Sequence, residues 1–157
     1  MYNEYMQFVP LCGGRMEGNM RIIGIDYGDA RVGVAVSDLL GLTAQGIRTI
    51  KNRSIKQLLS ELKEILAEYN PEKIVIGLPK NMDGSEGFRA EATYKFAQNL
   101  KKIYAGEIIF VDERLSSLGA KRYLSETNTF GQKRKNVLDT VAACIILEGY
   151  LNSNKNN

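Results

Sequence analysis

The amino-acid sequence predicts an α/β fold in which helices flank a mixed five-stranded sheet. Short apolar runs rich in Val and Ile recur along the chain and end at Gly, Pro or Asp, as strands do. Three such runs follow one another closely, and two helix–strand units come after them. The length of 157 residues, with 44% apolar and 25% charged side chains, suits one globular domain.

The first three strands are predicted to form an antiparallel meander. The first is expected at residues 20–26 and the second at 32–38, with a tight turn at residues 28–31 between them. The third is expected at residues 42–50. The short connections leave no room for a crossover, so neighbouring strands must run in opposite directions.

A helix and a buried strand follow the meander. Ser54 is a typical helix N-cap, and apolar residues at helical spacing continue to about residue 69, where Asn70 and Pro71 end the helix. Residues 73–77 are apolar almost throughout, which predicts a strand that is covered on both faces.

The second half of the domain is predicted to alternate between helix and strand. The loop at residues 78–87 is either a mobile wall of a cleft or a plain turn-rich connection. Ser116 or Ser117 is expected to cap a short helix. The elements are expected at residues 88–103 (helix), 107–111 (strand), 116–124 (helix) and 137–151 (helix).

The two ends of the chain are expected to lie outside the folded domain, which is placed at residues 20–152. Residues 1–19 lack the basic and apolar regions of a signal peptide and are interpreted as a disordered extension. Residues 153–157 are interpreted as a disordered polar tail. No stretch is apolar enough to span a membrane, and no disulfide framework is indicated, so a cytoplasmic protein is expected.

The composition excludes several kinds of catalytic site. The sequence contains no His, which excludes His-based acid–base chemistry, Ser-His-Asp triads and His-ligated zinc. The net charge of +3 is compatible with nucleic-acid binding but is weak evidence for it.

Three carboxylates lie in apolar surroundings in three separate elements. Asp26 follows the buried run of the first strand, Glu113 follows the fifth strand, and Asp139 lies inside the apolar stretch of the last helix. An ionised carboxylate is costly to bury unless it is hydrogen-bonded or bound to a cation. Carboxylate oxygens are the ligands that Mg²⁺ prefers. The three acids therefore suggest a divalent-metal site.

Each acid also has a purely structural interpretation. Asp26 could bond to the backbone of Gly28 in a turn. Asp112 competes with Glu113, because neighbouring side chains of a strand point to opposite faces. Asp139 could complement the positive end of its helix. The residues alone leave these alternatives open.

Four blocks of the sequence resemble, in order, those of the YqgF family, which is also called the RuvX family. They are IGIDYG with RVGVAVSD at residues 23–38, GLPKNMDGSEG at 77–87, VDERLSS at 111–117 and VLDTVAACIIL at 137–147. The opening block also resembles the first phosphate loop of actin-like ATPases and sugar kinases. Those proteins need two such domains, whereas this sequence indicates one.

The resemblance to the YqgF family implies a ribonuclease H-like fold and a metal-dependent nuclease. It selects Glu113 over Asp112 and implies that Asp26, Glu113 and Asp139 are catalytic and bind Mg²⁺ or Mn²⁺, with two ions present when substrate is bound. The expected function is processing of the 5′ end of the 16S rRNA precursor, in ribosome biogenesis. The alternatives are a Holliday junction resolvase acting on four-way DNA junctions and a non-catalytic nucleic-acid-binding factor with the same fold.

Five basic residues are candidates for nucleic-acid binding: Arg31, Arg114, Lys133, Arg134 and Lys135. The last three are predicted to lie in a polar loop just before Asp139, where they would neutralise phosphates. The alternatives are a solvated loop for this run and an ion pair of Arg31 with Asp29 or Asp38. The expected partner is structured RNA or branched DNA, bound by a monomer or a weak homodimer.

Overall fold

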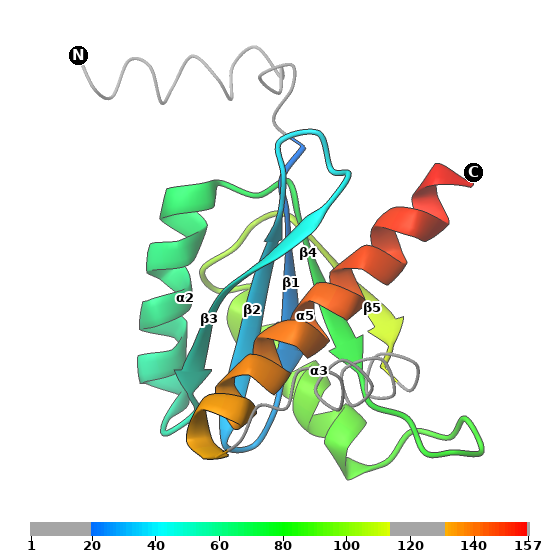
Figure 1. Cartoon of the computed structure of the whole chain (residues 1–157). Coiled ribbons are helices and arrows are strands. Elements are labelled where there is room, and N and C mark those ends of the chain that lie inside the picture. Colours follow the sequence, from blue (N-terminus) through cyan, green and yellow to red (C-terminus); the bar gives the residue numbers. More distant parts are fainter. Residues whose placement is uncertain (1–19, 114–130, 157) are drawn as a thin grey trace.

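The computed structural model describes residues 20–113 and 131–156, the first five residues of the second range by their backbone alone. Its elements are arranged around one sheet (Figure 1). The strands are β1 (Ile22–Tyr27), β2 (Arg31–Ser37), β3 (Ala44–Lys51), β4 (Lys73–Leu78) and β5 (Glu107–Asp112), and the helices are α2 (Ile55–Tyr69), α3 (Phe88–Leu100) and α5 (Gly131–Lys155).

The sheet has the predicted mixed topology. Its strand order is β3-β2-β1-β4-β5. β1 pairs antiparallel with β2, and β2 with β3, which confirms the meander. β4 pairs parallel with both β1 and β5. The helix that leads into β4 begins after Ser54, whose side chain accepts a hydrogen bond from the Gln57 N–H, so the predicted N-cap is confirmed.

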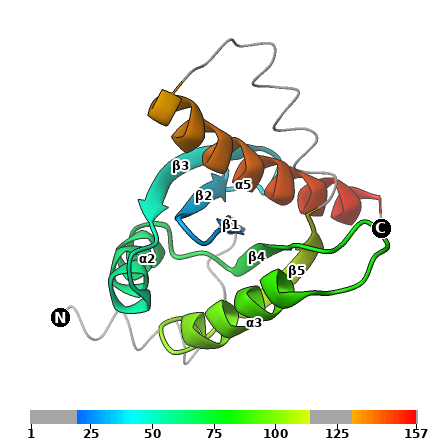
Figure 2. The ribbon, with the colours of Figure 1, turned by 90° about the horizontal axis from the view of Figure 1, so that it is seen from below.

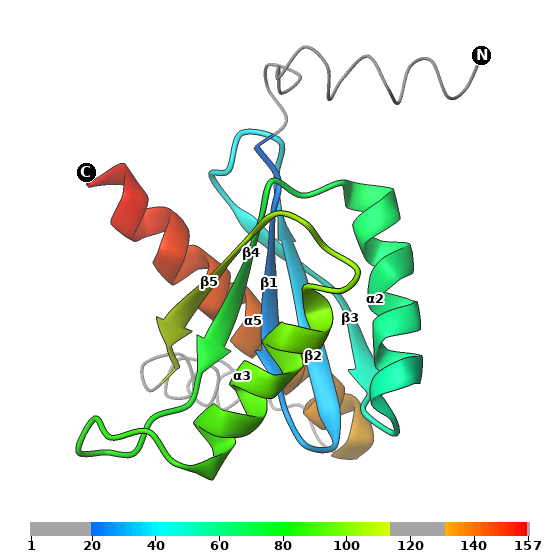
Figure 3. The same ribbon diagram turned by 180° about the vertical axis from the view of Figure 1, so that it is seen from behind.

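The helices cover the two faces of the sheet separately, with α2 and α3 on one face and α5 on the other (Figures 2 and 3). Side chains alternate between the faces along each strand. Ile23 and Ile25 of β1 belong to the core on the α2 and α3 side. Ile22 belongs to the smaller core under α5. Asp26 shares the parity of Ile22, so it points to the α5 face.

Helix α5 packs unusually close to the sheet, because glycines lie beneath it. A Cβ atom on Gly24 would lie 2.9 Å from the carbonyl oxygen of Ala143, and one on Gly33 would overlap the carbonyl group of Asp139. The hydroxyl group of Thr49 on β3 donates a hydrogen bond of 2.8 Å to the carbonyl of Asn136. These contacts fix where α5 crosses the central strands.

The structure corrects the predicted helix ends. α3 ends at Leu100, and residues 101–103 form a turn. α5 begins at Gly131 instead of 137, so the basic run at residues 133–135 is helical. The polar composition of this segment predicted a loop, but Gln, Lys and Arg are good helix formers. Residues 153–155 are helical too, and Lys155 Nζ donates a hydrogen bond to the Leu42 carbonyl. The expected helix at residues 116–124 and the expected disorder of residues 1–19 lie outside the described residues.

Within the described ranges, no helix combines the length and the apolar character that crossing a lipid bilayer requires.

Candidate functional site

The acid at the end of β1 lies in the middle of the sheet. Asp26 pairs with Gly33 of β2 and follows Ile25, which pairs with Ile76 of β4. The Gly28 N–H donates to the carbonyl of Arg31, at 3.0 Å. Because this N–H is already engaged, the interpretation of Asp26 as a turn-forming residue that bonds the Gly28 backbone is wrong. The Asp26 carboxyl group points instead toward helix α5.

Glu113, and not Asp112, has its side chain on the α5 face. Glu113 follows β5 directly, and its N–H donates to the carbonyl of Leu78, at 3.1 Å. Ile109 and Val111 pack in the core under α5, so alternation along the strand continues to Glu113. The Glu113 Cγ atom lies 3.4 Å from the position that a Cβ atom on Gly77 would take. From the sequence alone, alternation separates Asp112 from Glu113 but does not tell which of the two faces α5.

Asp139 reaches the same region from helix α5. It is the ninth residue of α5, and its backbone lies directly over Gly33, the partner of Asp26. The favourable interaction of an acid with a helix N-terminus falls off within the first turn. The interpretation of Asp139 as a residue that complements its helix end therefore has little support, and the close packing on Gly33 explains its position.

The electrostatics show that these acids interact. Burial, the charge of Glu113, a hydrogen bond that the protonated Asp26 carboxyl donates to Glu113, and the charge of Asp139 together raise the pKa of Asp26 from 3.8 to about 8. The positive charge of Arg89 opposes this rise. A carboxyl group with so high a pKa lies among like charges that a cation would neutralise.

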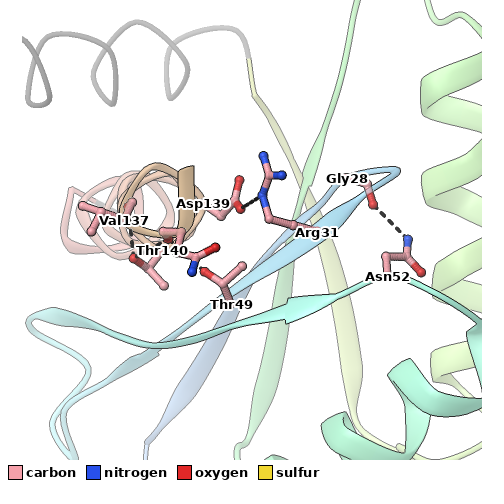
Figure 4. A network of polar contacts seen from close by, with 8 residues as sticks. Gly28, Arg31, Thr49, Asn52, Val137, Asp139 and Thr140 are labelled. Atoms are coloured by element: carbon pink, nitrogen blue, oxygen red, sulfur yellow. Dashed lines mark hydrogen bonds and ion pairs between the residues drawn. The ribbon is translucent and has the colours of Figure 1, made fainter. Parts of the chain in front are cut away.

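Arg31 forms an ion pair with Asp139. The sequence had suggested a phosphate contact for Arg31, or an ion pair with Asp29 or Asp38. Its Nε donates to Asp139 Oδ2 at 2.7 Å, and the side chains of Arg31 and Asp139 are 26% and 14% exposed (Figure 4). The turn that carries Arg31 is held by Asn52, whose side-chain amide donates to the Gly28 carbonyl at 2.9 Å. The expected pairing of Arg31 with Asp29 or Asp38 is wrong; Asp38 accepts hydrogen bonds from Leu42 and Thr43 instead.

The donor set suits a divalent cation, because all three candidate ligands are carboxylates and cations such as Mg²⁺ prefer oxygen ligands. Asp26 and Glu113 already meet through a hydrogen bond. Asp139 acts on Asp26 through its charge and is held by Arg31. In their present conformations, no three His, Cys, Asp or Glu side chains of the described residues are arranged to hold a metal ion. Shared coordination therefore requires a change of side-chain conformation in the cluster, in which one oxygen of Asp139 is engaged by Arg31.

The other predicted binding residues are placed only in part. Arg114 lies outside the described residues. The backbone of residues 133–135 lies at the start of α5, and Lys135 precedes Asp139 by one helical turn. The run is therefore part of the helix that carries Asp139 and not of a separate loop.

Sequence reasoning missed Arg89, the second residue of α3, whose charge acts on Asp26. Arg89 and Lys80 line a pocket of about 130 Å³ together with Phe88, formed by the loop after β4 and the first turn of α3. A basic residue at the positive end of a helix is unfavourable locally. This conflict with local preference was the signal that could have drawn attention to Arg89.

Comparisons with known proteins identify the family of the chain. A family model named RuvX and described as Holliday junction resolvase matches residues 20–153. The chain is 50% identical over 133 residues to a protein of Halothermothrix orenii named "Putative pre-16S rRNA nuclease", covering 85% of this chain and 95% of that one. It is 51% identical over 131 residues to a protein of the same name from Clostridioides difficile, covering 83% and 93%.

Solved structures share the fold at low sequence identity. Thermus thermophilus RuvC in complex with a Holliday junction substrate superposes with a TM-score of 0.58 at 12% identity, covering 88% of this chain and 97% of that one. Fowlpox virus resolvase in complex with Holliday junction DNA superposes with a TM-score of 0.52 at 16% identity, covering 85% and 98%. These likenesses support the ribonuclease H-like fold.

Proposed function

The chain belongs to the RuvX family, and from this membership we propose that it is a nuclease that hydrolyses phosphodiester bonds with the help of divalent metal ions. The observation that carries the proposal is the meeting of Asp26 and Glu113, with Asp139 close enough for its charge to act on Asp26. Folding has no use for three interacting acids on one face of a core sheet, whereas metal-assisted hydrolysis needs such a cluster.

The proposed ligands are Asp26, Glu113 and Asp139, and the proposed ions are Mg²⁺ or Mn²⁺. Two bound ions would supply Lewis acidity for the attacking and leaving oxygens. Asp26 would hold an ion from the central strand, while the other two acids would contribute from the end of β5 and from α5. Its rigid position preserves the geometry that an in-line reaction requires.

The substrate-facing residues of this chain would orient the phosphate. Arg31 neutralises Asp139 at 2.7 Å, and a guanidinium group at this place can pass to a phosphate oxygen when Asp139 turns to a cation. Arg114 and residues 133–135 are proposed to contact the nucleic-acid backbone, since phosphate contacts supply most non-specific affinity.

We favour precursor 16S rRNA, at its 5′ end, as the substrate. Relatives that share about half of their residues with this chain over most of their length carry the name of a pre-16S rRNA nuclease. A role in ribosome biogenesis would be carried out in the cytoplasm, which is the location that we propose. A single active site is sufficient for processing one strand, so a monomer suffices.

Resolution of four-way DNA junctions is the second candidate. It is favoured by the description of the family model and by the fold shared with resolvases solved on junction DNA. A resolvase must cut two symmetric strands, so this candidate predicts that two copies assemble on the junction.

A cleavage panel tests both candidates. Precursor 16S rRNA, single-stranded RNA, duplex RNA and a four-way DNA junction are incubated with the full chain, with Mg²⁺ or with EDTA. We expect cleavage at the 5′ end of the precursor in Mg²⁺ and none in EDTA. Symmetric cleavage of the junction alone would instead identify a resolvase. Absence of metal-dependent cleavage in the whole panel would refute the nuclease proposal.

A further inference from the structure

We propose that Phe88, Lys80 and Arg89 form a subsite that binds one unpaired nucleotide, with its base stacked on the Phe88 ring and its phosphate between the two cations. The inference deepens the proposed nuclease function and rests on it for the position of the scissile bond. It defines the substrate class as a nucleic-acid strand that is locally single-stranded.

The three residues line one pocket at the same end of the sheet as the acids. The pocket has a volume of about 130 Å³ and lies between the loop that follows β4 and the first turn of α3. Asp26, Glu113 and this loop all occupy the carboxyl ends of β1, β5 and β4 (Figure 3). In open α/β sheets, ligands bind beyond the carboxyl ends of parallel strands.

The Phe88 side chain is exposed and contributes little to the packing of the core. Its side chain is 77% exposed, so nearly the whole ring remains in water. Within the described part of the chain, the large hydrophobic residue more exposed than Phe88 is Met82, in the loop between β4 and α3. One exposed apolar residue is ordinary in a folded protein, but an exposed aromatic ring beside two cations is the pattern found in single-strand-binding proteins.

The cations are also placed at a local cost. Arg89 lies in the first turn of α3, where the partial positive charge of the helix disfavours a cation. Neither Arg89 nor Lys80 forms an ion pair with a residue in the described ranges. Residues that conflict with local preferences in this way concentrate at functional sites. An anion bound in the pocket would offset the unfavourable interaction of Arg89 with the positive end of α3.

The pocket and the acids share one edge of the sheet, because the loop that lines the pocket leaves the carboxyl end of β4, which lies between the strands that lead to Asp26 and Glu113. A strand whose phosphate lies on Arg89 can therefore extend along this edge toward the acids. Stacking on Phe88 requires an accessible base face, and bases inside a duplex already stack on each other. Stacking on an aromatic side chain contributes about 1–3 kcal/mol for each unpaired base.

A tryptophan reporter tests the stacking directly. The sequence contains no Trp, so Phe88→Trp introduces a single fluorophore at the pocket. The full chain is titrated in EDTA, which prevents cleavage, with single-stranded RNA, single-stranded DNA and blunt duplex of the same sequence. We expect strong quenching by both single strands and little by the duplex. The control is Leu40→Trp, at a 62% exposed position in the β2–β3 turn at the other end of the sheet.

Affinity measurements complete the test. Phe88→Ala should weaken single-strand binding by about 5- to 150-fold, the equivalent of one stacked base. Arg89→Gln should weaken binding and reduce the log–log salt slope by about one unit, and Leu40→Ala should change neither quantity. Equal quenching by duplex and single strand, or unchanged affinity of Phe88→Ala, would overturn the inference.

The two proposals can fail separately. Selective quenching by single strands in a protein that cleaves nothing would refute the nuclease function and support the subsite. Metal-dependent cleavage by a protein whose reporter is not quenched would refute the subsite alone.

Discussion

Replacement of Asp26 by Asn tests the interaction of the three acids. Asn has nearly the shape of Asp and imitates its protonated form without the charge. We expect Asp26→Asn to abolish metal-dependent cleavage, because a bridging carboxylate is lost. In the absence of metal we expect the same change to stabilise the fold, because a buried charge is removed and with it the repulsion from Glu113 and Asp139.

The magnitude follows from the pKa of Asp26. A carboxyl group whose pKa is raised in the folded state binds its proton more tightly there than in the unfolded chain, so stability is lost as the pH rises through the interval between the two values. For Asp26 this interval extends from 3.8 to about 8. At about 1.4 kcal/mol for each pH unit, the full penalty is about 6 kcal/mol. Because the Asn side chain is polar and keeps part of the cost of burial, the expected gain of the variant is about 2 to 5 kcal/mol at pH 9.

Urea denaturation in EDTA measures this gain. The stability difference between Asp26→Asn and the parent should be small at pH 4, grow toward pH 8 and then level off, with similar urea m-values throughout. Added Mg²⁺ should stabilise the parent chain and leave the variant almost unchanged, since a ligand stabilises only the state that binds it. A variant that is less stable than the parent at pH 9, or that cleaves at the parent's rate, would refute the reasoning.

Three further predictions concern other parts of the chain. Deletion of residues 1–19 should leave the thermal midpoint nearly unchanged, and a fall of many degrees in a melting curve would show that this segment packs on the domain. Changing the three basic residues at 133–135 to Ala should weaken binding to all nucleic-acid sequences alike and make the log–log salt slope shallower by up to about three units, as measured by fluorescence anisotropy. Gly33→Ala should destabilise the fold by about 1–3 kcal/mol or more, because the new methyl group would overlap the Asp139 carbonyl. Gly149→Ala lies in helix α5 with nothing within 4 Å of the new methyl group, so it should raise the stability by up to about 1 kcal/mol, because Ala is the better helix former.

The elements of the fold could be predicted because each depends on a local pattern. The run from Ile22 to Ile25 and the apolar β4 segment read as strands, and Ser54 marks the start of α2. The start of α5 was missed because the segment before residue 137 has no apolar face to reveal a helical period. Local patterns therefore predict where an element exists better than where it begins or ends.

By itself, the sequence determined that carboxylates lie at the ends of two core strands and on the last helix. An acid next to a buried apolar run can be recognised from the sequence alone, because burying its charge is costly. Only the tertiary structure decided which acids share a face and what else reaches them. Glu113 faces α5 because β5 pairs with β4 in one register, and Arg31 pairs with Asp139, 108 residues away, because α5 lies on Gly33. Arg89 comes within reach of Asp26 because α3 begins beside the strand ends. Side-chain neighbours across a sheet depend on register and on the closeness of helix packing, and neither property is encoded by any single segment.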